Sequence, residues 1–164
     1  MTILTKEELL ELLAKEYQIL KHLHAKINPG TETFRFTEKQ RTTLELLRFL
    51  AHQGSSLVNL LAAKSDEAWA QLEKRTENMA LEQFPVEIER EQKEIIDIIN
   101  SWSEEQMNEV VSLWGMSYTR KRWLVGTLLE QFVAYRMQLF LQIKASGRPE
   151  LNTMNLWAGM DGSM

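Results

Sequence analysis

Residues 119–147, TRKRWLVGTLLEQFVAYRMQLFLQIKASG, contain the longest apolar periodicity of the chain. Large apolar residues recur there at steps of three and four, which is typical of one face of a helix. Gln131, Tyr135 and Gln138 are interleaved with that face. Because buried polar groups need hydrogen-bond partners, such a helix either satisfies polar side chains in a core or forms the wall of a site.

Length and composition indicate one domain over residues 1–164. With 164 residues, 44% of them hydrophobic and 26% charged, the chain can bury a substantial core. A net charge of -4 argues against nucleic-acid binding. The absence of cysteine excludes disulfides and thiolate metal sites and favours the cytoplasm. We expect no secretory signal, because the first residues are soon acidic, and no apolar run approaches the roughly 18 residues of a membrane span.

Capping boxes and breakers predict the remaining helices. Thr5 to Glu8 is a capping box, and the helix it begins should end at Asn28-Pro29-Gly30. A second box at Thr37 to Gln40 predicts a helix through about Ala63. Residues 65–83 favour a short helix followed by an irregular crossover. A third long helix should begin at Pro85, and Ser103 should cap a short one.

Residues 113–118 are predicted to form a loop, and about 148–164 an irregular tail whose Leu151, Leu156 and Trp157 pack back on the body. The fold class is therefore all-α. Four main helices with a long connection between the second and third fit a four-helix bundle of the up-down-down-up type.

The sequence contains no phosphate-binding loop, nucleophile elbow or paired metal motif. The histidines are therefore the main candidates for metal ligands or reactive side chains. His24 falls on the buried stripe of the first helix and His22 on another face. His52 lies mid-helix beside Gly54-Ser55-Ser56. His24 and His52 each fit two interpretations. Each is either a buried histidine with one hydrogen bond or a metal ligand.

His52, Arg136, Gln138 and Gly147 lie at positions that carry a family resemblance. The chain resembles the DinB-like four-helix bundle family, also described as YfiT-like metal-dependent hydrolases. The resemblance implies that a histidine of the second helix joins two histidines, four residues apart, on the last helix to bind a divalent metal. The last-helix pattern of that family ends in His-Arg-Gly-Gln.

At the two ligand positions of the last helix this chain has Gln131 and Tyr135. Neither an amide nor a neutral phenol replaces an imidazole well for Zn or Ni. Glu130 lies about 100° further round the helix and cannot easily substitute. We therefore expect a degenerate metal site at His52, Gln131 and Tyr135 with no bound metal. Its surrounding residues would be Arg136, Gln138, His24 and Glu130, and no catalytic residue is assigned.

Three functions remain open. The first is a non-catalytic binding or scaffold protein, expected as a homodimer, without nucleic-acid or membrane partners. The second is a metal-dependent enzyme of the hydrolase or thiol-cofactor transferase type, holding Zn or Ni weakly through His52, with His24 and either Glu130 or Tyr135. The third is a small-molecule carrier, with a pocket at Gly54-Ser55-Ser56 beside Trp114 and Trp123.

Overall fold

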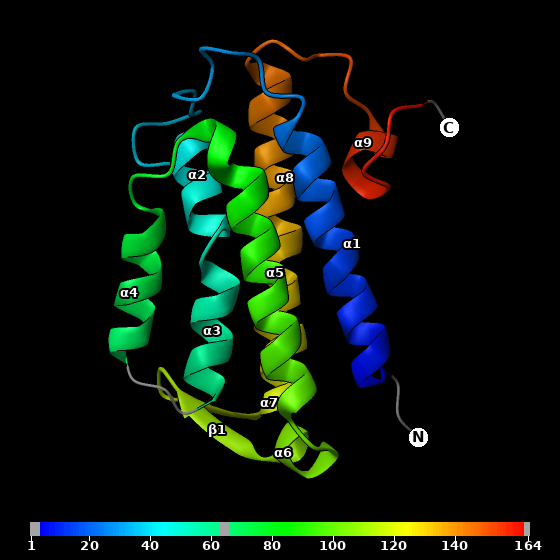
Figure 1. Cartoon of the computed structure of the whole chain (residues 1–164). Coiled ribbons are helices and arrows are strands. Elements are labelled where there is room, and N and C mark those ends of the chain that lie inside the picture. Colours follow the sequence, from blue (N-terminus) through cyan, green and yellow to red (C-terminus); the bar gives the residue numbers. More distant parts are fainter. Residues whose placement is uncertain (1–3, 63–65, 163–164) are drawn as a thin grey trace.

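Four long helical segments pack side by side in the computed structural model, which describes residues 4–62 and 66–162 (Figure 1). The first is α1 (Lys6–His24), and the second is α2 (Thr43–Leu50) followed by α3 (Gln53–Leu61). The third is α5 (Phe84–Ser101) and the fourth contains α8 (Glu130–Ala145). In Figure 1 these segments run up, down, down and up in chain order. The predicted all-α fold is confirmed.

The long connection between the second and third segments is itself helical. It consists of α4 (Asp66–Thr76), which lies against α3, and a 3-10 turn, η1 (Leu81–Gln83). The prediction of a short helix and an irregular crossover at 65–83 is therefore confirmed for the residues that the structure describes. Pro85 stands in the first turn of α5, where its missing amide costs no hydrogen bond.

The two predicted capping boxes have different outcomes. Thr5 accepts a 3.1 Å hydrogen bond from the Glu8 amide, and Glu8 accepts a 2.7 Å bond from the Thr5 amide, so α1 begins as predicted. The box at Thr37 was wrong, because residues 37–40 form turns and α2 is capped by Thr42 and Glu45. No apolar residue lies between 37 and 43, so helical turns there would bury no apolar side chain.

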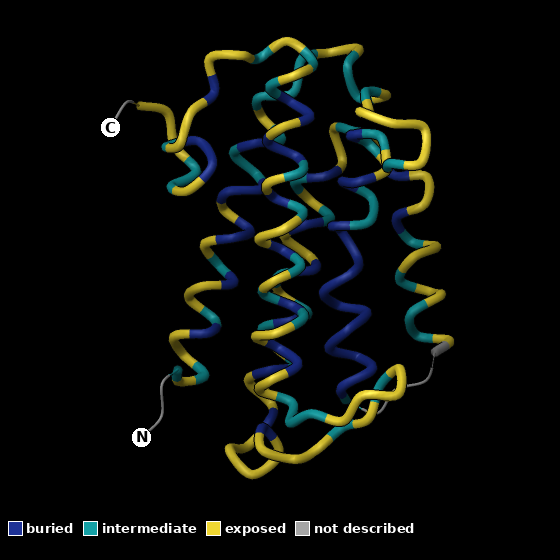
Figure 2. The backbone as a smooth tube through the Cα atoms, turned by 180° about the vertical axis from the view of Figure 1, so that it is seen from behind, coloured by how far each residue is buried: buried dark blue, intermediate teal, exposed yellow. Residues whose placement is uncertain are grey.

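The predicted helix from Thr37 to about Ala63 is also interrupted. α2 ends at Leu50, His52 leaves the helical conformation with φ -139° and ψ -21°, and α3 begins at Gln53. Every residue of α3 is buried, and it forms the continuous dark blue helix in Figure 2. α3 is therefore the central helix of the bundle.

A β-hairpin replaces the loop predicted for residues 113–118. It follows α6 (Glu104–Asn108) and pairs β1 (Val110–Leu113) with β2 (Met116–Thr119) in antiparallel register. Trp114 and Gly115 form its turn with φ of 53° and 78°. Two-residue hairpin turns with both φ positive match the twist of the strands, which explains why so short a ladder forms.

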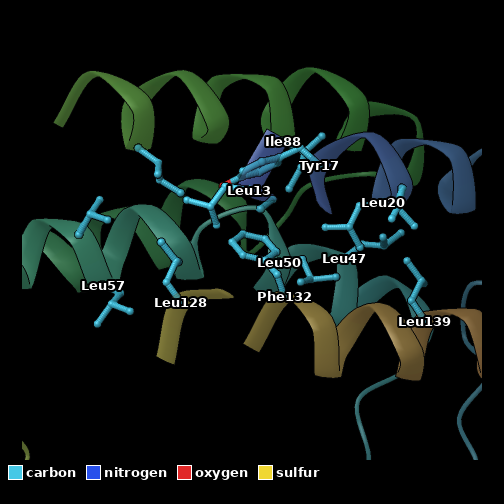
Figure 3. Packing of buried hydrophobic residues seen from close by; sticks show 14 of the residues in the cluster. Leu13, Tyr17, Leu20, Leu47, Leu50, Leu57, Ile88, Leu128, Phe132 and Leu139 are labelled. Atoms are coloured by element: carbon cyan, nitrogen blue, oxygen red, sulfur yellow. The ribbon is translucent and has the colours of Figure 1, made fainter. Parts of the chain in front are cut away.

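The fourth segment begins directly after the hairpin. α7 (Arg120–Trp123) leads through a π-helical stretch, η2 (Leu124–Leu129), into α8. Figure 3 shows Leu128 and Phe132 of this segment packed into the apolar core. The rings of Phe132 and Tyr17 lie 5.0 Å apart and join the fourth segment to α1.

The tail contains a short helix, α9 (Thr153–Trp157), where irregular structure was predicted. Leu151 and Leu156 are buried as predicted, whereas Trp157 is largely exposed and lies beneath the Arg136 guanidinium. Asn152 caps α9. Within residues 4–62 and 66–162, no helix has the length and apolarity needed to cross a bilayer.

Candidate functional site around His52

His52 lies at the break between α2 and α3 and is only 4% exposed. Its Nδ1 is 3.3 Å from the hydroxyl of Ser56, one turn further along. The rings of Phe49 and Trp69 meet the imidazole edge-on at centroid distances of 5.6 and 6.3 Å. Burial lowers the pKa of His52 to about 4, and the positive charges of Arg41 and Arg75 contribute. The imidazole is therefore neutral at pH 7.

Tyr135 reaches the same region from α8 through an aromatic neighbour. Its ring packs edge-on against Phe49 at 5.1 Å, so Phe49 contacts both Tyr135 and His52. The guanidinium of Arg41 lies over the Phe49 ring at 4.1 Å and is 5.8 Å from the centre of the Tyr135 ring. Gln131 and Gln138 are half-buried on the same side of α8. Their amides form no hydrogen bond with any part of the chain that the structure describes.

The other residues proposed around the site are engaged elsewhere. His24 Nε2 is 2.8 Å from the Leu81 carbonyl, and its ring packs against Phe84. Glu130 is exposed on the outside of α8. Arg136 is buried and donates a 2.7 Å hydrogen bond to the carboxylate of Glu16 on α1. Arg136 is therefore part of the buried core and is paired with α1.

The donors near His52 do not fit a first-row transition metal. Zn and Ni sites in proteins use imidazole, thiolate and carboxylate ligands converging at about 2.0–2.3 Å. Between residues 4 and 62 and between 66 and 162, no three side chains of these types gather into such a group. The proposed combination of His52 with His24 and Glu130 is not brought together.

Glu91 is a buried functional group that the sequence interpretation missed. This α5 residue is fully buried, and its Oε1 accepts hydrogen bonds of 2.7 and 3.1 Å from the amides of Gly54 and Ser55. Burial raises the pKa of Glu91 to about 8, although these two bonds act in the opposite direction. The sequence indicated that Glu91 is buried, because it stands three residues after Ile88 and four before Ile95. Residues at this spacing lie on the same apolar face of a helix.

A polar network extends from Glu91 toward the surface between α4 and α5. The Ser55 hydroxyl donates a 2.9 Å hydrogen bond to Glu94. Arg75 of α4 binds both oxygens of Glu94, at 2.7 and 3.2 Å. Asn59 donates a 2.7 Å bond to the Ser55 carbonyl. Three helices thus contribute side chains to one hydrogen-bonded group.

The pocket predicted at Gly54-Ser55-Ser56 is not present. A Cβ atom on Gly54 would lie 2.6 Å from Ile95 Cδ1 and 3.2 Å from Leu128 Cδ1, so neighbouring side chains fill this space. The glycine allows α5 to approach α3 closely. Trp114 instead lines a surface cleft of about 320 Å³ with Leu60, Trp69 and Ala70.

The bundle is similar to the solved structure of a DinB-like protein. A DinB-like protein from Bacillus subtilis, YjoA, superimposes with a TM-score of 0.70, covering 88% of this chain and 95% of that chain at 15% identity. No family model and no curated protein matches the chain. The fold is therefore that of a DinB-like helical bundle.

Proposed function

We propose that this chain is a non-catalytic binding or scaffold protein built on a DinB-like bundle, and that it associates with a second copy of itself. The environment of His52 supports the proposal that the protein is not a metal-dependent catalyst. Its nearest polar partner is the Ser56 hydroxyl, and aromatic rings occupy two other sides. A single neutral imidazole beside one hydroxyl and two aromatic rings is a poor ligand set for a tight divalent site.

Metal binding by the purified full chain tests this part. Titration calorimetry with ZnCl2 and NiCl2 should show no stoichiometric ion, and His52→Ala should leave the titration unchanged. His22→Ala is the matched control, because His22 is a histidine of α1 whose Nε2 lies 3.1 Å from Asn155 and 3.7 Å from Asp161. One ion per chain, bound in the wild type and lost only in His52→Ala, would reject the proposal and favour the metal-dependent enzyme.

The outer side of the fourth segment, formed by η2 and α8, supports association. Val125, Val133, Met137 and Leu141 are 37–45% exposed, and with the half-buried Leu129 they follow one another at steps of four. These residues, 125, 129, 133, 137 and 141, are called the apolar ridge below. Glu130 is the one exposed charged residue between Trp123 and Ile143. A contiguous apolar row on an exposed helix face marks a surface that another protein covers.

A second copy of the chain is the occupant that the ridge geometry favours. Ridges formed at steps of four on both helices interdigitate at about -50°, the commonest helix-packing class. In a two-fold dimer both partners contribute the same surface. One ridge with a step of four therefore supplies both of the ridges that this packing class needs. The neighbouring row contains the small exposed residues Gly126 of η2 and Ala134 of α8, with the exposed Glu130 between them.

Sedimentation tests the association. The wild type should be a dimer at micromolar concentration, and Met137→Glu should be a folded monomer with unchanged helical circular dichroism. Val86→Glu is the control, because Val86 is an exposed apolar residue on α5. A wild-type monomer, or equal dissociation in both variants, would refute the proposed interface.

A further inference from the structure

Residues 151–162, which include α9, form a strap on the outside of the bundle. α9 lies against α1 and α8 (Figure 1). Leu151 and Leu156 are buried apolar residues of the strap, whereas Trp157 and Met160 are 53% and 48% exposed. An isolated helix of five residues is not stable in water. α9 therefore keeps its helical structure only while the strap is docked.

Asn155 connects the strap to α1 through a hydrogen bond of defined direction. It is 3% exposed, and its Oδ1 accepts a 2.9 Å bond from the Asn152 amide at the start of α9. Its Nδ2 therefore faces α1, where it lies 3.1 Å from Nε2 of His22. Because an amide nitrogen only donates, His22 Nε2 is the acceptor and carries no proton. The docked strap thus matches a neutral His22.

Protonation of His22 would remove this hydrogen bond, because two donors would then face each other. Asp161 of the strap lies 3.7 Å from His22 Nε2, but it already pairs with Lys26 at 2.6 Å. Burial and the positive charge of Lys26 lower the pKa of His22, whereas Asp161 acts in the opposite direction. The docked strap therefore disfavours the charged imidazole.

Lys26 of α1 and Asp161 of the strap are the charged groups that act on His22. Neighbouring charged side chains on α1, α8 and the turn after α8 have partners of their own: Lys21 with Glu89 of α5, Arg136 with Glu16, Lys144 with the Leu151 carbonyl, and Arg148 with Glu150. His24, two residues along α1, bonds to the Leu81 carbonyl. The charge of His22 is therefore the variable one at this contact.

The strap covers a buried charged pair. The Arg136 guanidinium lies 5.0 Å from the centre of the Trp157 ring and pairs with Glu16. Arg136 Nε and Glu16 Oε2 are buried, and neither has a hydrogen-bond partner within residues 4–62 and 66–162. Removal of the strap would open this pair to solvent. Docking of the strap therefore controls access to these two groups.

We infer that the strap is a pH-sensitive cover, docked while His22 is neutral and released when His22 is protonated. In the released state the imidazole is solvated and titrates near its ordinary pKa of about 6.5. The docked state has a lower pKa, so below about pH 6.5 the released state binds more protons and docking weakens. This inference goes beyond the proposed binding role and does not depend on it.

Amide hydrogen exchange of the full chain, followed by NMR, tests the release. The amides of Leu156 and Ala158 bond to carbonyls inside the strap, so their protection reports docking. Between pH 7.5 and 5.0 their protection factors should fall at least about threefold, which is the effect of half a pKa unit. The amides of α5 should show no such fall. Constant protection in the strap, or an equal fall in α5, would overturn the inference.

His22→Gln separates titration from packing, because a glutamine oxygen can accept from Asn155 but does not titrate. Protection of the strap in this variant should be the same at the two pH values. His24→Gln is the matched control, since it removes the other histidine of the last turn of α1 and should keep the wild-type fall. A wild-type fall in His22→Gln would refute the role of His22.

Linkage provides a second measurement that does not require a change at His22. If docking lowers the pKa of His22, then loosening the strap must raise it. Gly159→Ala places a Cβ 3.1 Å from the Ile19 Cα and should loosen the strap. The His22 pKa, read from imidazole proton shifts, should therefore be higher in this variant than in the wild type. Equal values in the two proteins would contradict the coupling.

Discussion

The Glu91 carboxyl oxygen Oε1 lies 2.7 Å from the backbone nitrogen of Gly54 and accepts its hydrogen bond. In an uninterrupted helix, the amides of Gly54 and Ser55 would instead bond to the carbonyls of Leu50 and Ala51. The contact therefore ties the break at His52 to the docking of α5 on α3. It explains why the second segment of the bundle is two helices.

Gly54→Ala should destabilise the protein despite the better helix propensity of alanine. The added methyl group would lie 2.6 Å from Ile95 Cδ1 and 3.1 Å from Glu91 Oε1. Overpacking of this kind costs about 1–3 kcal/mol, which outweighs roughly 1 kcal/mol of propensity. Urea denaturation measures the difference. Gly126→Ala is the control, because no atom lies within 4 Å of its added Cβ, and it should not lose stability.

Glu91 should make the free energy of unfolding fall as pH rises from about 4.5 to about 8. The unfolded carboxyl ionises near 4.5, whereas burial keeps it protonated in the folded protein up to about 8. Over this window the unfolded state binds fewer protons, so stability decreases by up to about 1.4 kcal/mol per pH unit.

Glu91→Gln should reduce this slope. The amide oxygen can still accept from Gly54 and Ser55, and the amide group does not titrate. Urea denaturation of both proteins between pH 5 and 8 measures the effect. The same pH slope in the variant and the wild type would contradict the assignment of the raised pKa to Glu91.

The buried ion pair of Arg136 and Glu16 should be costly to break from one side. Both side chains are almost completely buried, and burial raises the pKa of Glu16 even with Arg136 at 2.7 Å. Arg136→Met leaves an unpaired buried carboxylate and should cost about 3–5 kcal/mol. Combined replacement of both residues by methionine should recover most of that loss. Additive losses in a double-mutant cycle would show that the pair is not coupled.

Gly159→Ala should loosen the attachment of α9 to α1. Gly159 has a φ of 62°, and an added Cβ would lie 3.1 Å from the Ile19 Cα. Limited proteolysis should cut the variant near the tail faster than the wild type. Gly30→Ala has a similar positive φ with no atom within 4 Å. The Gly30→Ala variant therefore has backbone strain without a steric clash. Equal proteolysis of the two variants would show that the clash with Ile19 does not contribute to the loosening of α9.

Much of the bundle could be predicted from local sequence. Apolar residues of α1 at steps of three and four face the core, because an isolated helix already places them on one side. Thr5 and Pro85 mark helix starts through interactions within one turn. The candidate site was less predictable. His52 and Tyr135 were identified as polar residues facing the bundle, but the Phe49 ring that contacts both was not.

The sequence alone determined that the chain forms long amphipathic helices and which faces they bury, because these properties depend on residues three or four positions apart. Only the tertiary structure decided where the second segment breaks, since Glu91 lies 37 residues beyond Gly54. The tertiary structure also engages Arg136 with Glu16, 120 residues earlier, and surrounds His52 with aromatic rings from α2 and α4. Such partners are separated along the chain, and only packing brings them into contact.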